Sequence, residues 1–419
     1  RQRLRGGDTV RKHLVVWMTI GLLAIVGTGF AAAKTTLTFW NGFTGPDRPV
    51  LEQLVAEFNE ANPDIEIKMD IQPWDTLFQK LMTAYVVGKG PDIAAFATEN
   101  IPQYASAGVL APLDDIYESG QLDPTVLVPA ILENVKYEDK SYAVPMNFAT
   151  LLLYYNKDHF AKAGLPTDPP KTWDEFKEYI LTLTNPPERY GLAIAARETI
   201  PMWPILIWGN GGEILTRDGQ VLIDSPETKE AMHFWTEIVR DKKASPIGLT
   251  GAEADKLFQT GKASMEMVGP WMTSGFTAAG LNYDVAPVPA GPKRQVTLGT
   301  SVAMVISKPA AADTQKKAAA YKFFEFWNSR EAQVKWALGS GFPPTRTDLL
   351  DDPRIMEDPW VSKFAAAADQ AHFYLQGTDK FRAIETDVLV PAIEAILLGR
   401  QDVDTALDDA GAQLRALIK

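Results

Sequence analysis

The chain has 419 residues, of which 46% are hydrophobic, and this is enough to build globular cores in two lobes or domains. Acidic residues outnumber basic ones by 53 to 41, so nucleic acid and anionic lipid are not expected partners. The chain contains no cysteine, which excludes disulfide bonds, thiolate catalysis and cysteine-ligated zinc.

The first 33 residues have the pattern of a secretory signal peptide. Five basic residues precede an apolar run, Leu14–Phe30, which is followed by three alanines, Ala31–Ala33. We therefore expect export with cleavage after Ala33. Loss of the five basic residues and one acidic residue would change the net charge from −12 to −16. Because the apolar run has 17 residues, an uncleaved membrane anchor is the alternative.

Strand and helix patterns alternate over the following segment. Strands are expected at 36–40, 65–71 and 93–96, and helices between them at 51–58 and 77–85. This alternation predicts a parallel sheet covered by helices on both faces, which is one α/β lobe.

Two later segments carry clear signals for helix ends. The apolar run Leu151–Tyr155 predicts a buried strand, followed by a helix that Asn156 can cap and Gly164 can end. Near the C-terminus, Pro391 is expected to kink a helix, and Gly399 is expected to end it.

Several short motifs together resemble one family. They are Gly90–Ile93, Tyr104–Leu110, Tyr155–Asp158, Pro169–Trp173, Gly269–Trp271 and Gly399–Gln401. Their order and spacing are similar to those of the family 1 extracellular solute-binding proteins of bacterial ABC importers, which include maltose-binding and glycerol-3-phosphate-binding proteins. The resemblance extends from Thr35 to Ile418.

The resemblance implies an α/β chain with the two-lobe periplasmic binding protein fold of type II and a ligand cleft between the lobes. The implied limits are 34–148 plus 302–345 for lobe one and 149–298 plus 346–419 for lobe two. The chain would cross between the lobes near 147–150, near 297–301 and between 339 and 352.

The function implied by the resemblance is transport rather than catalysis. The protein would be a periplasmic receptor that captures a mono- or oligosaccharide and delivers it to the transmembrane subunits of an ABC importer. We expect a monomer that has no cofactor. The missing cysteine removes the lipid anchor that many such receptors carry, so we expect a freely diffusing protein.

Residues at or just after the ends of predicted strands are the first candidates for the binding site, because ligands of open α/β sheets bind at the carboxyl ends of the strands. They are Trp40, Asn41, Glu99 and Asn100, and the same logic adds Asn147 at the first crossing. A sugar needs flat apolar surfaces for its C–H faces and paired polar groups for its hydroxyls, and these residues offer both. The family places a carboxylate or amide close to Glu99. Alternatively, Trp40 packs in the core, Glu99 stabilises a helix dipole and Asn147 satisfies hinge backbone groups.

The second half of the chain adds further candidates. In the family, the tryptophan of a Gly-Pro-Trp motif lies under the sugar, which implies this role for Trp271. One of Trp203 and Trp208 is expected to face the cleft, and Phe342 and Arg382 are candidates for its rim. Trp235 is expected in the core, because apolar residues flank it at helical spacing.

Two other cargoes or activities remain as alternatives. A glycoside hydrolase needs only two carboxylates and stacking aromatic residues. A glycerol-3-phosphate receptor is similar around Pro145–Asn156, but Phe148 and Ala149 stand where those receptors have serines. Ala149 also replaces a glutamate of the maltose-binding pattern. The four histidines are scattered, so we expect neither a metal site nor catalytic residues.

Overall fold

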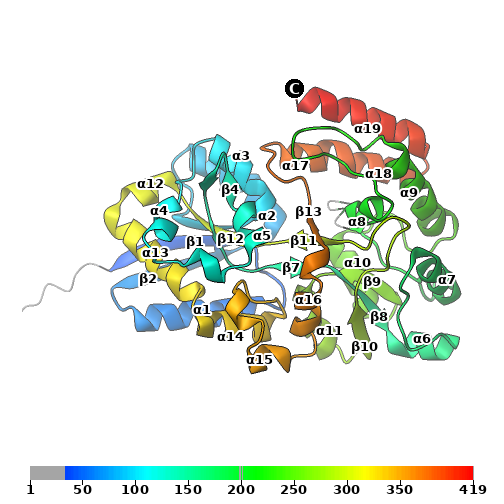
Figure 1. The fold of residues 1–419 in the computed structure, drawn as a ribbon, viewed down its shortest axis with the longest axis horizontal. Helices are drawn as coiled ribbons and strands as arrows, with labels where there is room; N and C mark the ends of the chain where they lie inside the picture. Colours follow the sequence, from blue (N-terminus) through cyan, green and yellow to red (C-terminus); the bar gives the residue numbers. More distant parts are fainter. Residues whose placement is uncertain (1–33, 198–199, 201, 419) are drawn as a thin grey trace, which may run out of the picture. The chain divides into compact units, whose positions relative to one another are not determined.

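The computed structural model describes residues 34–197, 200 and 202–418, and residues 35–419 form one compact unit (Figure 1). The signal peptide expected at 1–33 lies outside the described residues. Within the described part of the chain, no helix is long and apolar enough to cross a membrane.

The first lobe is built on a five-stranded sheet in the order β2-β1-β3-β12-β6. Its strands are β1 (Thr35–Asn41), β2 (Ile65–Ile71), β3 (Ile93–Ala97), β6 (Val144–Pro145) and β12 (Val302–Ile306). β1 is parallel to β2 and β3, as the alternation of strands and helices predicts. The sheet is mixed rather than parallel throughout, which corrects the sequence prediction. β12 is antiparallel to both β3 and β6, because the chain enters it from the second lobe.

Helices cover both faces of this sheet. They are α1 (Arg48–Ala61), α13 (Thr314–Trp327) and α14 (Arg330–Ser340) on one face, and α2 (Trp74–Val86) and α3 (Ile101–Ser106) on the other. Successive strand residues point to opposite faces. Phe39 therefore packs against Phe323 of α13, and Phe96 packs against Tyr104 of α3.

The second lobe is built on a three-stranded antiparallel sheet in the order β10-β8-β9. Its strands are β8 (Leu152–Asn156), β9 (Met265–Val268) and β10 (Tyr283–Ala286). The surrounding helices include α6 (Lys157–Ala163), α7 (Trp173–Leu183), α8 (Met202–Gly209), α9 (Pro226–Thr236), α10 (Gly251–Gln259), α18 (Val390–Leu397) and α19 (Val403–Leu417). Asn156 caps α6 by accepting a hydrogen bond from the His159 N–H, and Gly164 ends α6 with φ of 70°. Both helix signals are confirmed.

A small third sheet lies where the chain passes between the lobes. It consists of β7 (Ala149–Thr150), β11 (Thr297–Thr300) and β13 (Ala371–Phe373), and Figure 1 shows it between the two larger parts. β11 is the central strand, because Gly299 pairs with both Thr150 and Phe373. The chain leaves the first sheet after Pro145 and returns to it at Val302. The detailed lobe limits inferred from the sequence stay a prediction.

The helical C-terminal region has one irregular turn. A π-helical turn at Ile384–Leu389 joins α17 (Phe381–Ala383) to α18. Pro391, near the start of α18, has no N–H with which to continue the helical bonding pattern, so the irregularity lies directly before it. Gly399 follows α18 with φ of 66°, which confirms its role as a helix stop.

Candidate functional site

A cavity of about 680 Å³ is lined by residues of both lobes and of the third sheet. The first lobe contributes the turn after β1, the start of α2 and the segment after β3. The second lobe contributes the Gly-Pro-Trp turn after β9 and the segment from β13 to α17. This volume falls within the usual range of small-molecule sites.

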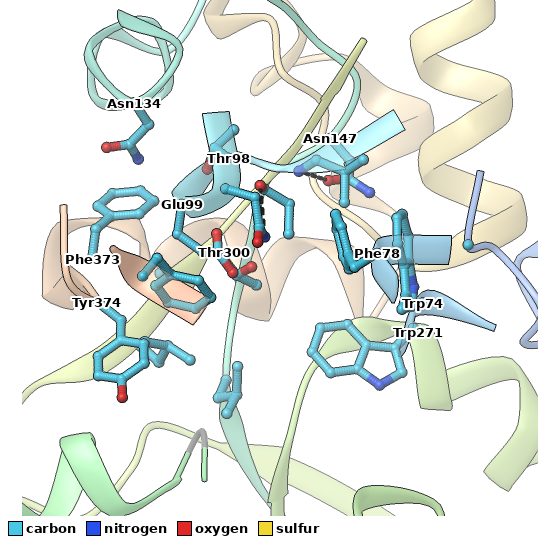
Figure 2. A pocket seen from close by; sticks show the side chains of 18 of the residues that line it. Trp74, Phe78, Thr98, Glu99, Asn134, Asn147, Trp271, Thr300, Phe373 and Tyr374 are labelled. Carbon is cyan, nitrogen blue, oxygen red and sulfur yellow. Dashed lines mark hydrogen bonds between the residues drawn. The ribbon is translucent and has the colours of Figure 1, made fainter. Parts of the chain in front are cut away.

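Aromatic side chains from both lobes border the cavity. Trp74 and Phe78 of α2 are stacked, with ring centroids 5.9 Å apart and an interplanar angle of 19°. The ring centroids of Trp271 and Phe342 lie 6.1 Å apart. In Figure 2, Trp74, Phe78 and Trp271 gather on one side of Glu99, and Phe373 lies on the other. Flat apolar rings on two sides of a cavity suit the C–H faces of a sugar.

Two glycines give the indole rings their positions. A Cβ atom at Gly269 would lie 1.9 Å from the ring of Trp271, and one at Gly42 would lie 2.0 Å from the ring of Trp74. Each glycine therefore lets an indole lie directly against the backbone. Gly269 has φ of −85°, a backbone conformation that any residue can adopt. Glycine is needed there only because the indole leaves no room for a Cβ atom.

Several buried polar atoms of the cavity wall have no hydrogen-bond partner among the described residues. They are Asn147 Nδ2, Asn100 Oδ1, Asp47 Oδ1, Asn134 Nδ2 and the Tyr374 hydroxyl. Asn147 is 1% exposed, and its Oδ1 accepts a hydrogen bond of 2.8 Å from the Val302 N–H. Because buried polar groups in folded proteins are normally paired, these atoms are available to a bound ligand or to water.

The charged groups of the cavity wall are mainly acidic. Among the described residues, the acids are Asp47, Glu99, Glu133, Asp255 and Glu385, and the bases are Lys136, Arg217 and Arg382. Burial raises the pKa of Glu99 to about 7, although the positive charge of Arg382 acts in the opposite direction. Burial likewise raises the pKa values of Asp47 and Asp255 to about 6. An additional anion is therefore poorly matched to this cavity.

Six of the ten site residues expected from the sequence line this cavity. They are Glu99, Asn100, Asn147, Trp271, Phe342 and Arg382. They come from the segment after β3, from the segment between β6 and β7, from the turn after β9, from the segment after α14 and from α17. Whether they bind a ligand stays a prediction.

Trp203 and Trp208 lie elsewhere, and the structure corrects the expectation that one of them faces the cleft. Both belong to α8, whose described residues are all buried, and the two indoles are 0% and 1% exposed. The Trp203 indole N–H donates to the Ala195 carbonyl oxygen, and that of Trp208 donates to Glu213 Oε1. With their N–H groups satisfied internally, they form part of the second lobe's core. Trp235 also lies in that core, as expected.

Trp40 and Asn41 also fall outside the cavity lining. Trp40 packs against the helices α2 and α3, which is the core alternative stated above. Asn41 is completely buried, and its Oδ1 accepts a hydrogen bond from the Phe43 N–H in the turn after β1. The cavity begins one residue later, at Gly42.

Sequence reasoning missed other residues of the wall. Trp74 directly follows Pro73 after β2, so the rule that selected the other strand ends also applies to it. Phe78 lies one helical turn further on. Phe373 and Tyr374 belong to a strand of only three residues, and no pattern in the sequence identifies so short an element. Among the described residues, no group of three or more His, Asp or Glu side chains could hold a metal ion.

Comparisons with known proteins agree with this architecture. A family model described as bacterial extracellular solute-binding protein matches residues 53–363. The maltotriose-binding protein of Pyrococcus abyssi is 28% identical over 80% of this chain and 72% of its own length. The sn-glycerol-3-phosphate-binding periplasmic protein of Brucella abortus is 26% identical over 93% of this chain and 94% of its own. The ABC substrate-binding protein Lmo0181 of Listeria monocytogenes, solved with cycloalternan, has a TM-score of 0.83 at 26% identity and covers 92% and 99% of the two chains.

Proposed function

This chain belongs to the bacterial extracellular solute-binding protein family, and we propose that it captures a neutral carbohydrate between its two lobes for an ABC importer. One observation carries the choice of cargo. The cavity combines stacked aromatic rings with buried amide, carboxyl and hydroxyl groups that lack partners within the described chain. A sugar supplies C–H faces for the rings, and its hydroxyls both donate and accept hydrogen bonds.

Capture follows from contacts that only the closed arrangement makes. A ligand that touches Trp74 in one lobe and Trp271 in the other favours closure, because it loses one set of contacts when the lobes separate. Asn147 lies at the crossing between the lobes, where its Nδ2 can donate to the same ligand.

The second candidate cargo is glycerol-3-phosphate, which the name of the Brucella relative favours. Lys136, Arg217 and Arg382 could attract its phosphate. However, Lys136 pairs with Glu133 at 2.7 Å, and the acids of the wall outnumber these bases. The balance of charge therefore supports a neutral sugar over an anion.

Delivery and location complete the proposal. The closed, loaded receptor would be recognised by the transmembrane subunits of an ABC importer outside the cytoplasmic membrane. It would act as a monomer and bind its cargo without chemical change, as a receptor does. The family and the fold are those of substrate-binding receptors.

A thermal-shift screen of the exported protein against mono- and oligosaccharides and glycerol-3-phosphate tests this function. A ligand at 100 times its dissociation constant adds about 2.7 kcal/mol of apparent stability. We expect such a shift for a neutral sugar, which the protein should return unchanged after incubation. A shift with glycerol-3-phosphate alone would select the second candidate. Hydrolysis of the sugar that persists through purification and disappears in Glu99→Gln would show a glycoside hydrolase instead.

A further inference from the structure

A buried pair of carboxyl groups lies beneath one wall of the cavity. Asp255 on α10 lines the same cavity as Trp271 and Met272. Glu266 lies on β9, is 1% exposed, and forms a side-chain hydrogen bond with Asp255. Its second oxygen, Oε2, has no partner among the described residues.

The strand pattern explains why Glu266 points toward Asp255. Met265 and Met267 of β9 belong to the main core of the second lobe, so the alternate residues Glu266 and Val268 face the other side. On that side, Val268 packs with the α10 residues Ala254 and Phe258 in an apolar cluster. The charged form of a carboxyl group is strongly disfavoured in such surroundings.

No basic side chain is recorded as a partner of this pair within the described residues. The titratable group that faces Glu266 from β8 is Tyr154, which lies opposite it in the strand register. The Tyr154 hydroxyl is occupied elsewhere, at 3.1 Å from the Gly269 carbonyl oxygen and 2.9 Å from Thr273 Oγ1. The other titratable group is Asp255 itself, on α10. Burial and the neighbouring acid both raise the pKa of Glu266, so it holds a proton that it can donate to Asp255.

We propose that Asp255 is a cargo-binding carboxylate in the same cavity wall as Trp271, and that Glu266, buried behind it and hydrogen-bonded to it, is its positioning residue. This inference rests on the proposed function and deepens it. With one side of Asp255 held by Glu266, its other acceptor positions can receive hydrogen bonds from cargo hydroxyls in the cavity. The site therefore selects a polyol or sugar that presents a donor hydroxyl there, and it excludes an anionic group.

Variants of the two residues separate these roles. Asp255→Asn replaces an acceptor by an amide, and we expect sugar affinity to fall at least tenfold with the fold intact. Glu266→Gln keeps a donor for Asp255, so affinity should stay within about threefold of the unsubstituted protein. Glu266→Leu suits the apolar cluster but leaves Asp255 unsupported, so affinity should fall at least fivefold while thermal stability is retained or increased. A purely structural Glu266 would give the reverse for Glu266→Leu: lowered thermal stability and unchanged affinity.

The measurements are calorimetric titration with the sugar that gives the largest thermal shift, thermal unfolding of each variant, and carbon-13 NMR of the carboxyl carbons in the unliganded protein. The NMR signal of Glu266 should be that of a protonated acid at pH 7. An ionised Glu266, or Asp255→Asn with full affinity, would overturn this inference and leave the proposed function standing. If the unsubstituted protein binds no carbohydrate at all, both are overturned.

Discussion

At the scale of single residues, Gly269 and Trp271 act as one unit. The indole of Trp271 lies against Gly269 and is partly exposed to the cavity. We expect Trp271→Ala to weaken sugar binding about 30-fold, because loss of a central aromatic anchor costs about 2 kcal/mol. Trp271→Phe should keep part of the affinity. Calorimetric titration measures all of these affinities.

Gly269→Ala is the sharper variant, because it leaves the indole in the chain and only displaces it. The added Cβ would meet the ring at 1.9 Å, so affinity should fall nearly as far as in Trp271→Ala. Trp208→Phe is the control, since this buried tryptophan should affect the unfolding temperature and not the affinity. Unchanged sugar binding in Gly269→Ala would show that the position of Trp271 is irrelevant to the cargo.

The side chain of Asn147 has two ends that can be tested separately. Its Oδ1 accepts from the Val302 N–H, and its Nδ2 has no partner among the described residues. Asn147→Asp retains the acceptor and removes the amide donor, so we expect about tenfold weaker sugar binding, and the new buried carboxyl group should lower stability at neutral pH. Asn147→Ala removes both and should lower stability as well. Equal affinities for Asn147→Asp and the unsubstituted protein would leave Asn147 a hinge residue only.

Glu99 should make the stability of the unliganded protein depend on pH. Its folded pKa of about 7 lies above the ordinary value of 4.5, so the folded state favours the protonated form. The resulting stabilisation is complete below about pH 4.5 and is lost as the pH rises through about 7. Glu99→Gln has no group that ionises here, so its free energy of unfolding should not fall in this way. Between pH 5 and pH 8 the unsubstituted protein should therefore lose roughly 1–3 kcal/mol more unfolding free energy than Glu99→Gln does.

Denaturant unfolding at both pH values measures this difference. Glu57→Gln is the control, because the pKa of Glu57 is lowered rather than raised in the folded protein. Lys335 lowers the pKa of Glu57 at the surface, so this substitution should bring no gain at high pH. Parallel pH profiles for Glu99→Gln and the unsubstituted protein would mean that folding does not raise the pKa of Glu99.

At the scale of elements, sequence patterns predict the helices and strands that depend on residues nearby in the chain. The alternation from β1 to β3 and the caps of α6 are local patterns, and both are confirmed. The reversed direction of β12 depends on a crossing from the second lobe, which no local pattern contains.

The same distinction holds for the site. Residues at predicted strand ends included Glu99, Asn100 and Asn147, which line the cavity, and the same rule would have found Trp74. The tryptophans of α8 could not be placed from sequence, because a helix that is apolar on all sides gives no sign of which side faces a cavity. Tyr374 reaches the wall through β13, whose pairing with β11 joins residues more than seventy positions apart.

Helices α2 and α17 make a direct contact across the lobes. The guanidinium carbon of Arg382 lies 5.5 Å from the centre of the Phe78 ring. A cation–π contact contributes about 0.5–1 kcal/mol at a partly exposed site. We therefore expect Phe78→Leu to reduce the closed-to-open ratio of the unliganded protein by a factor of about two to five, and small-angle scattering should detect an increased radius of gyration.

Tyr321→Leu provides the matched control for this contact. Lys317 lies 5.2 Å from the ring of Tyr321, and both residues belong to α13 within one lobe. Its removal should leave the radius of gyration unchanged. An equal radius for Phe78→Leu would mean that the contact does not hold the lobes together.

At the scale of the whole molecule, charge distinguishes the two candidate cargoes. The chain has a formal net charge of −12, and acids predominate in the cavity wall. The dissociation constant of a neutral sugar should change less than twofold between about 20 and 500 mM salt, because salt screens only interactions between charged groups. Calorimetry across this range tests the expectation. Binding of glycerol-3-phosphate that weakens steeply with salt and is lost in Arg382→Ala would contradict it.

The sheet formed by β7, β11 and β13 also limits how the molecule can move. Linkers that are not paired with one another would let the lobes bend, slide or rotate, whereas strands joined by ladder hydrogen bonds resist sliding past one another. Twist is the soft deformation of a narrow sheet, since the rotation between neighbouring strands varies widely at little energetic expense. The lobes should therefore open mainly by a twist of this sheet, so that a single torsion angle describes the path between the empty and the loaded receptor.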